Sequence, residues 1–204
     1  MTGSRRSRLP DHYSRRKDSN FQLLKNTIMS LKLCKDKMCS KLSWRNWEIS
    51  SFSSEEREGE GDTNGHAVRV LDGNSFTFWH SQWCGRTAQY PHFLVIDLGE
   101  VLDVDKICLT QRKNLCRAVK EIEIYAGKDL DGLEKINSYV LEEVLGSQMF
   151  EFPSRQNIRL LKIEMLSSWD NEPFAAISKI SLFRNENDSE QCKLPNISFL
   201  QYQK

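Results

Sequence analysis

The sequence predicts an all-β protein built as an antiparallel β-sandwich or jelly roll. Three observations support this fold class: apolar and polar residues alternate with a period of two, glycine and proline separate the short runs, and no long stretch has helical periodicity. Short strands joined by turns are typical of sandwiches and jelly rolls, in which two layers pack around one core.

Six segments carry the strand pattern, at residues 93–98, 106–111, 119–125, 147–152, 159–166 and 177–183. The first of these is almost entirely apolar, as expected for a largely buried strand, whereas 119–125 alternates apolar with charged residues, as expected for a strand with one buried face. Residues 135–145 fit either a short helix or a strand followed by a loop.

The chain has 204 residues and a net charge of +1, which fits one domain with extensions and gives no global attraction to nucleic acid or membrane. We predict a basic and disordered N-terminal arm at 1–45, the sandwich at 46–184 and a polar C-terminal tail at 185–204. No apolar run reaches the roughly 18 residues of a membrane span, and no secretory signal is readable.

The six cysteines lack the spacing of a zinc site. Cys108 is expected to be a buried free thiol, although a Cys108–Cys116 disulfide remains an alternative. The sequence also lacks the common motifs of hydrolases, metalloproteases and nucleotide-binding enzymes, so we predict that the protein is not an enzyme. The acidic residues of 55–60 are expected to form a solvated loop.

The stretch 68–83, VRVLDGNSFTFWHSQW, combines a sharp turn with a histidine between two tryptophans. In Asp72-Gly73-Asn74, a glycine that can adopt positive φ lets several oxygens converge, and the hydroxyl of Thr77 could join them. The alternative is an ordinary tight turn followed by aromatic core residues.

Several motifs in order along about 140 residues resemble the coagulation factor 5/8 type C, or discoidin, domain, and are closest to bacterial carbohydrate-binding modules of family 32. These motifs are Trp47, SSEE at 53–56, GEG at 59–61, LDGN at 71–74, TFWHSQW at 77–83, Pro91-His92, IDLG at 96–99, Gln111-Arg112 and residues 177–183. The resemblance implies a galactose-binding-domain-like jelly roll of about eight strands.

The resemblance also implies a sugar site at one rim of the sandwich, in which His80 and Arg112 occupy two of three polar positions. At the third, an asparagine of the family is replaced by Cys116-Arg117, and Asn114 could substitute from a shifted loop. Read without the resemblance, His80 could instead be a partly buried histidine making local hydrogen bonds.

Two tryptophans, Trp83 and Trp169, are candidate platforms for a sugar ring, although a large aromatic such as Trp83 can equally fix a loop. Arg112 could instead form an ordinary ion pair with Glu121 or Asp97. Each of these residues thus has two possible roles, one in sugar binding and one in stabilising the fold.

A structural Ca²⁺ beside the turn is the third implication of the resemblance. The implied ligands are the carbonyls of Arg69, Asn74, Thr77 and Ser178, the hydroxyl of Thr77 and the carboxylate of Asp72. However, Lys179 stands where the family has a glutamate, which puts calcium binding in doubt unless Glu172 compensates.

We therefore expect a non-catalytic, lectin-like carbohydrate-binding module that recognises galactose-type or amino-sugar glycans. The alternative is a protein-interaction or adhesion domain on the same fold with a degenerate sugar site. The expected partners are glycans or glycoproteins, and possible protein partners, with neither nucleic-acid binding nor membrane insertion. The resemblance implies an extracellular or cell-surface location.

Overall fold

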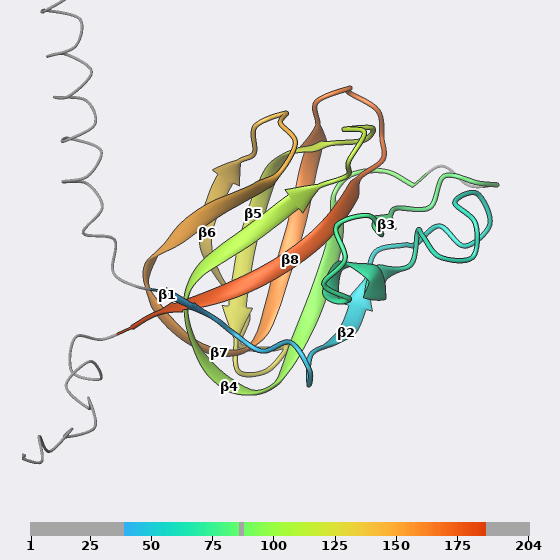
Figure 1. Cartoon of the computed structure of the whole chain (residues 1–204). Coiled ribbons are helices and arrows are strands. Elements are labelled where there is room, and N and C mark those ends of the chain that lie inside the picture. Colours follow the sequence, from blue (N-terminus) through green and yellow to red (C-terminus); the bar gives the residue numbers. More distant parts are fainter. Residues whose placement is uncertain (1–38, 86–87, 187–204) are drawn as a thin grey trace, which may run out of the picture. The chain divides into compact units, whose positions relative to one another are not determined.

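The structure is a computed structural model, which describes residues 39–85 and 88–186 (Figure 1). The strands are β1 (Cys39–Lys41), β2 (Glu48–Phe52), β3 (Trp79–His80), β4 (His92–Gln111), β5 (Val119–Gly127), β6 (Glu134–Val140), β7 (Ser147–Ser168) and β8 (Ala176–Asn185), with one 3₁₀ helix, η1 (Ala67–Leu71). All pairings between these strands are antiparallel, which confirms the predicted fold class. No helix in the described ranges is both long and apolar enough to cross a bilayer.

The two longest strands, β4 and β7, belong to both layers of the sandwich. The first part of β4 pairs with β2 and the end of β7, whereas its last residues pair with β8 and the start of β7. The β4–β7 register breaks between Asp97 and Leu102, and again between Val104 and Lys106. The sequence patterns at 93–98 and 106–111 are therefore two parts of one strand, and those at 147–152 and 159–166 are likewise parts of β7.

The core lies between the layers and follows the predicted alternation. In β5, for example, Val119, Ile122 and Ile124 are buried, while charged residues between them face outward. Residues 135–145 form most of β6 and the loop after it, so the strand interpretation is confirmed. Cys108 is buried and both Cys108 and Cys116 are free thiols.

The N-terminal edge of the sandwich lies earlier than the sequence pattern indicated. Within the segment assigned to the basic arm, Cys39–Lys41 forms β1, which pairs with the end of β8. Residues 1–38 of that arm, and the tail beyond residue 186, lie outside the described residues.

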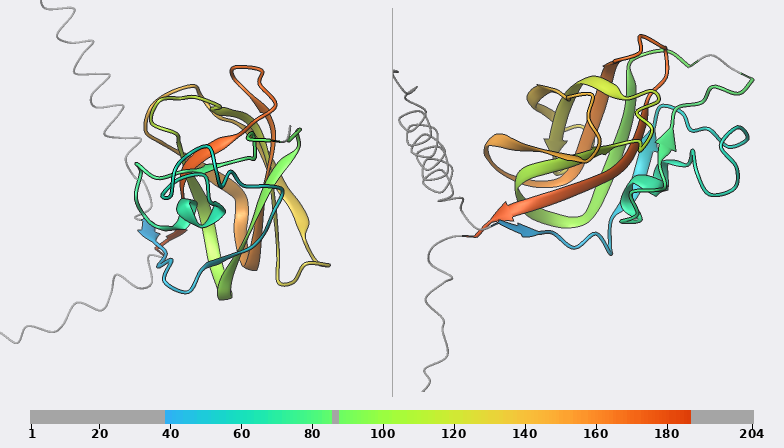
Figure 2. Two further views of the ribbon diagram at one scale, coloured as in Figure 1. Left: turned by 90° about the vertical axis from the view of Figure 1, so that its right-hand side faces the viewer. Right: turned by 45° about the horizontal axis from the view of Figure 1, so that its top comes forward.

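The segments between β2 and β4, which include most of the stretch 68–83, form a loop-rich flank of the sandwich. Segments between β2 and β4 gather on this side in all three views, coloured cyan to green (Figures 1 and 2). Trp79 anchors them to the core: its ring is fully buried and its Nε1 donates a hydrogen bond of 2.9 Å to the carbonyl of Ser54. His80 follows directly and pairs in β3 with Ala176 of β8.

Glu56 fixes this flank by accepting four backbone hydrogen bonds. One carboxylate oxygen accepts from the N–H groups of Glu58 and Gly59, each at 2.9 Å, and the other accepts from those of Trp83 and Cys84 at 2.8 and 2.7 Å. The residue is only 1% exposed. The expectation of a solvated acidic loop is therefore wrong for Glu56, because its charge is satisfied by backbone donors.

Burial alone would raise the pKa of Glu56, but the four donors outweigh this effect and lower the pKa from 4.5 to about 2. A carboxylate with a depressed pKa stabilises the fold fully above its unfolded-state pKa. That contribution is lost as the pH falls from 4.5 through about 2.

We expect Glu56→Gln to lower the free energy of unfolding at neutral pH by roughly 3 kcal/mol, because an amide cannot accept on its nitrogen side and leaves buried N–H groups unpaired. Chemical denaturation of the two proteins at several pH values measures the effect. The difference should shrink in acid. Glu58→Gln, at an exposed neighbouring carboxylate, is the matched control and should change stability little. Equal destabilisation by both substitutions would contradict the proposed role of Glu56.

Candidate functional site

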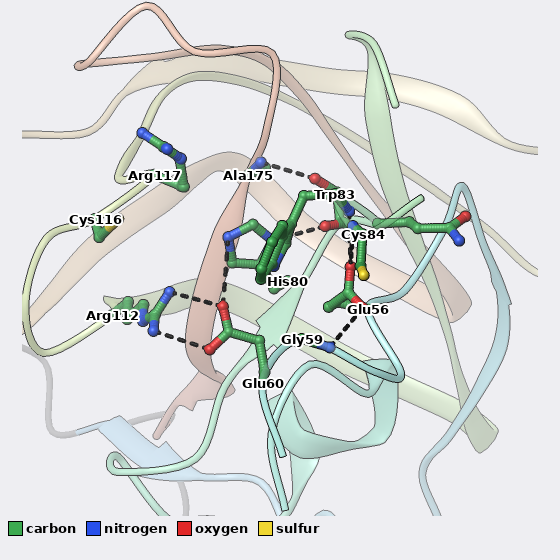
Figure 3. Close-up of polar contacts among 12 residues, drawn as sticks. Glu56, Gly59, Glu60, His80, Trp83, Cys84, Arg112, Cys116, Arg117 and Ala175 are labelled. Carbon is green, nitrogen blue, oxygen red and sulfur yellow. Dashed lines mark hydrogen bonds and ion pairs between the residues drawn. The ribbon is translucent and has the colours of Figure 1, made fainter. Parts of the chain in front are cut away.

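A pocket of about 270 Å³ lies where the loop-rich flank meets the ends of β4 and β8 (Figure 3). Its lining combines charged, aromatic and sulfur-containing side chains: Glu60, His80, Trp83, Arg112, Cys116, Arg117 and Phe174. These residues come from four separate segments of the chain. Three of the five predicted ligand-binding residues, His80, Trp83 and Arg112, therefore meet in one place.

His80 presents one ring nitrogen to this pocket. Its Nδ1 lies 2.6 Å from the carbonyl oxygen of Ser81, and since a carbonyl can only accept, Nδ1 carries the proton. Burial lowers the pKa of His80 and outweighs the Ser81 carbonyl and the Glu60 carboxylate, which raise it; the positive charges of Arg112 and Arg117 add to the lowering. The imidazole is therefore neutral at neutral pH, which leaves Nε2 as a hydrogen-bond acceptor. Its 4.0 Å approach to Glu60 is then not an ion pair.

Arg112 and Glu60 form the polar floor of the pocket. The two guanidinium nitrogens Nη1 and Nη2 donate to the two carboxylate oxygens at 3.3 and 3.1 Å, a bidentate arrangement that fixes both groups. The guanidinium also lies 3.9 Å from the ring centre of Phe78. The partners considered from sequence, Glu121 and Asp97, are not used: Asp97 pairs with Arg159.

Trp83 forms one wall and is 41% exposed. The indole packs against Gly59, where an added Cβ would lie 2.3 Å from Cζ2 of the ring. Only glycine can therefore occupy position 59 with the indole in this place. Because the carboxylate of Glu56 holds the N–H groups of both Gly59 and Trp83, the ring and its support are fixed together.

The opposite side of the pocket is the loop between β4 and β5. Gln111 closes this loop across its base, since its side-chain amide donates to the carbonyl of Val119 at 2.7 Å and accepts from the N–H of Val119 at 3.1 Å. Leu115 and Arg117 both have left-handed φ, at 57° and 60°. The Arg117 guanidinium pairs with Asp170 at 2.8 Å, which ties the loop to the one before β8.

The other two predicted ligand-binding residues do not line this pocket. Asn114 is exposed, and its side-chain oxygen accepts from the N–H of Cys116 at 3.1 Å. Trp169 donates from Nε1 to the carbonyl of Leu141 at 3.0 Å and packs beneath the ammonium of Lys120. Trp169 therefore fixes a loop beside the site.

Sequence reasoning missed Glu60 and Phe174. Glu60 was part of the acidic loop expected to be solvated, yet its side chain is only 14% exposed and faces Arg112. The GEG motif at 59–61 was the available signal, since the glycine that supports Trp83 directly precedes this acid. Phe174 carried no comparable signal, because it lies in an irregular loop far along the chain.

The turn expected to hold calcium is closed by its own hydrogen bonds. The carboxylate of Asp72 accepts from the N–H of Asn74 at 2.8 Å and from the hydroxyl of Thr77 at 2.7 Å. The Arg69 guanidinium lies 3.9 Å from the same carboxylate. Ser178 is buried in β8, and its hydroxyl has no hydrogen-bond partner in the described residues.

The predicted ligands offer Ca²⁺ enough oxygens, namely four carbonyls, one hydroxyl and one carboxylate, but little negative charge. The number of charged ligands is one of the factors that set the affinity of a protein site for Ca²⁺, so this set fits the ion poorly in charge. Asp72 is the one carboxylate in the predicted set, both of its oxygens accept hydrogen bonds, and a guanidinium already balances its charge. Across the described ranges, no group of three or more His, Cys, Asp or Glu side chains is arranged to hold a metal ion.

Comparison with known proteins matches residues 48–180 to the F5/8 type C domain model. A curated sialidase from Micromonospora viridifaciens is 32% identical over 139 residues, which span 66% of this chain and 21% of the sialidase. The chain therefore corresponds to about a fifth of that relative's length.

Solved structures show the same arrangement of strands. The C-terminal domain of a chitobiase from Bacteroides fragilis is 30% identical, with a TM-score of 0.66, and the match covers 72% of this chain and 100% of that domain. The family 32 carbohydrate-binding module of C. perfringens NanJ, solved in complex with galactose, is 24% identical with a TM-score of 0.61, and covers 72% and 100% of the two chains.

We expect Gly59→Ala to displace the indole of Trp83, because the new methyl group would overlap the ring. Since the ring is partly exposed and can swing outward, the cost in stability should stay below about 1–2 kcal/mol. The indole N–H signals in a ¹H–¹⁵N NMR spectrum test this: the Trp83 signal, assigned with Trp83→Phe, should shift more than the other four. An unchanged Trp83 signal would show that Gly59 does not set the ring position.

Proposed function

Because the chain belongs to the F5/8 type C domain family, we propose that the pocket around His80 binds a sugar and that the domain is a non-catalytic carbohydrate-binding module. The carrying observation is the convergence of a neutral histidine acceptor, a bidentate Arg112–Glu60 pair and the exposed Trp83 ring in one pocket. The preferred ligands are galactose-type or amino-sugar residues of glycans or glycoproteins.

The polar groups suit the hydroxyl groups of a sugar. A hydroxyl can donate one hydrogen bond and accept others, so it can donate to Nε2 of His80 or to the Glu60 carboxylate and accept from Arg112. All three side chains are held before the ligand arrives, by Ser81 in one case and by each other in the other two. Little conformational entropy is then lost on binding.

The aromatic walls suit the apolar face of a sugar ring. Trp83 has a partly exposed indole, and Phe174 lies on the same pocket with its ring centre 6.2 Å from that of His80. Stacking of C–H groups on such a ring adds apolar contact to the hydrogen bonds. The fold neighbour from C. perfringens NanJ, which is in complex with galactose, supports this class of ligand.

The floor of the pocket gives no reason to expect hydrolysis. Glu60 is the single carboxylate among the lining residues, and Arg112 engages both of its oxygens. Glycosidases usually place two carboxyl groups on either side of the bond that they cleave. The groups that line the pocket therefore fit sugar binding better than glycoside hydrolysis.

A glycan array followed by calorimetry tests the proposal. We expect binding of terminal galactose or amino-sugar residues, with His80→Ala and Arg112→Ala each weakening it about tenfold or more, because each removes a hydrogen bond of the buried floor. Arg159→Ala, which removes an exposed arginine paired with Asp97, is the matched control and should leave affinity unchanged.

Silence across the array would contradict sugar binding. If a pull-down then recovered a protein whose binding depends on Arg112 or Arg117, the protein-interaction alternative would replace it. One observation favours this alternative: Cys116 and Arg117 line the pocket at the position where the resemblance implies an asparagine that contacts the sugar.

Sugar affinity should fall in acid. The pKa of His80 is lowered from 6.5, mainly by burial, so Nε2 accepts a hydrogen bond throughout the neutral range. As the pH falls through this depressed pKa, Nε2 becomes protonated and the acceptor is lost. Calorimetric titration between about pH 5 and pH 8 should show constant affinity at the upper end and a decline only below the ordinary histidine pKa. A decline that began above pH 6.5 would implicate a different group.

A further inference from the structure

Lys179 lies beside the turn that the resemblance assigns to calcium. It is half-buried in β8, where it pairs in register with Thr110 of β4, and it lines a small cavity together with Leu71 and Gly73 of the turn region. None of the ion pairs found among the described residues involves Lys179. Lys179 therefore lies beside the turn and forms no ion pair with Asp72.

The space behind the turn is already filled. Trp44 lies 3.4 Å from the position that a Cβ on Gly73 would take, and the ammonium of Lys41 sits 5.0 Å above the Trp44 ring. The cavity left between Lys179, Trp44 and the turn measures about 10 Å³. This is at the lower limit for one water molecule, so Trp44 and Lys179 pack tightly beside Gly73.

We infer that the domain keeps its loop-rich flank in order without Ca²⁺, because Lys179 brings a positive charge beside this turn where the resemblance implies a carboxylate. The turn is stabilised instead by the chain's own charges and packing: Arg69 balances Asp72, Thr77 and Asn74 close the ring of hydrogen bonds, and Trp44 covers Gly73.

The balance of charge supports this assignment. A divalent ion is stable in a protein where carboxylates offset its charge. Here the single carboxylate of Asp72 faces the guanidinium of Arg69, and Lys179 and Lys41 bring two more positive charges to the same region. Among the formal charges of this region, an added metal ion would meet one carboxylate and three cations. Lys179 stands where the resemblance implies a glutamate, so one residue reverses the charge on which the metal would depend.

Thermal unfolding of the full chain, in millimolar CaCl₂ or in a chelator, tests the inference without any sugar. We expect the midpoint of the natural protein to differ by less than about 1 °C between the two conditions. Lys179→Glu should restore a response, with Ca²⁺ raising the midpoint by about 3 °C or more, because a ligand that binds only the folded state stabilises it. Calorimetry should likewise detect Ca²⁺ binding only in this variant.

Two variants control for charge and for folding. Lys179→Gln removes the cation without adding a carboxylate and should fold and remain insensitive to Ca²⁺, which keeps the test informative if Lys179→Glu fails to fold. Lys128→Glu reverses an exposed charge on another loop and should also give no response. Stabilisation of the natural protein by Ca²⁺ would overturn the inference. A folded Lys179→Glu variant without a response would show that Lys179 is not the residue that excludes the metal.

Discussion

The geometry of the pocket depends on the buried carboxylate of Glu56. A single side chain receives hydrogen bonds from two segments that are far apart in sequence, the loop before the 3₁₀ helix and the loop after β3. Without these contacts, both loops would carry unpaired backbone donors in a buried position, which is costly. Glu60 and Trp83 lie within a few residues of the two points that it joins. Glu56 therefore positions residues of the pocket through the two loops, although its own side chain does not line the pocket.

The charges inside the pocket are balanced before any ligand enters. Arg112 and Glu60 are largely withdrawn from water, at 16% and 14% exposure, and each neutralises the other. Such pairs contribute little net stability, because desolvation offsets most of the attraction. Their value is geometric: two polar groups are held at fixed positions beside a histidine whose tautomer is set by one carbonyl. This suits recognition of a neutral ligand with several hydroxyl groups.

Much of this was accessible from sequence. The period-two alternation identified the fold class, and the motif around His80 together with Arg112 identified residues that do meet in space. Pattern reasoning failed where the deciding partner is distant in the chain. It assigned Glu56 and Glu60 to solvent, because a run of acids looks solvated unless the backbone donors and the arginine that face it are known. It also placed Asn114 at the site, whereas the left-handed residues Leu115 and Arg117 turn the loop so that Cys116 faces the pocket instead.

The pairing of β1 with the end of β8 bears on how the domain can be carried. His80 is paired with the first residue of β8, while Cys39 is paired with the last. A ten-residue strand spans about 30 Å, so the two points at which the backbone enters and leaves the sandwich lie together, a full strand length from the pocket. The connections of the sandwich to the rest of the chain and its candidate binding pocket are therefore at opposite ends of β8.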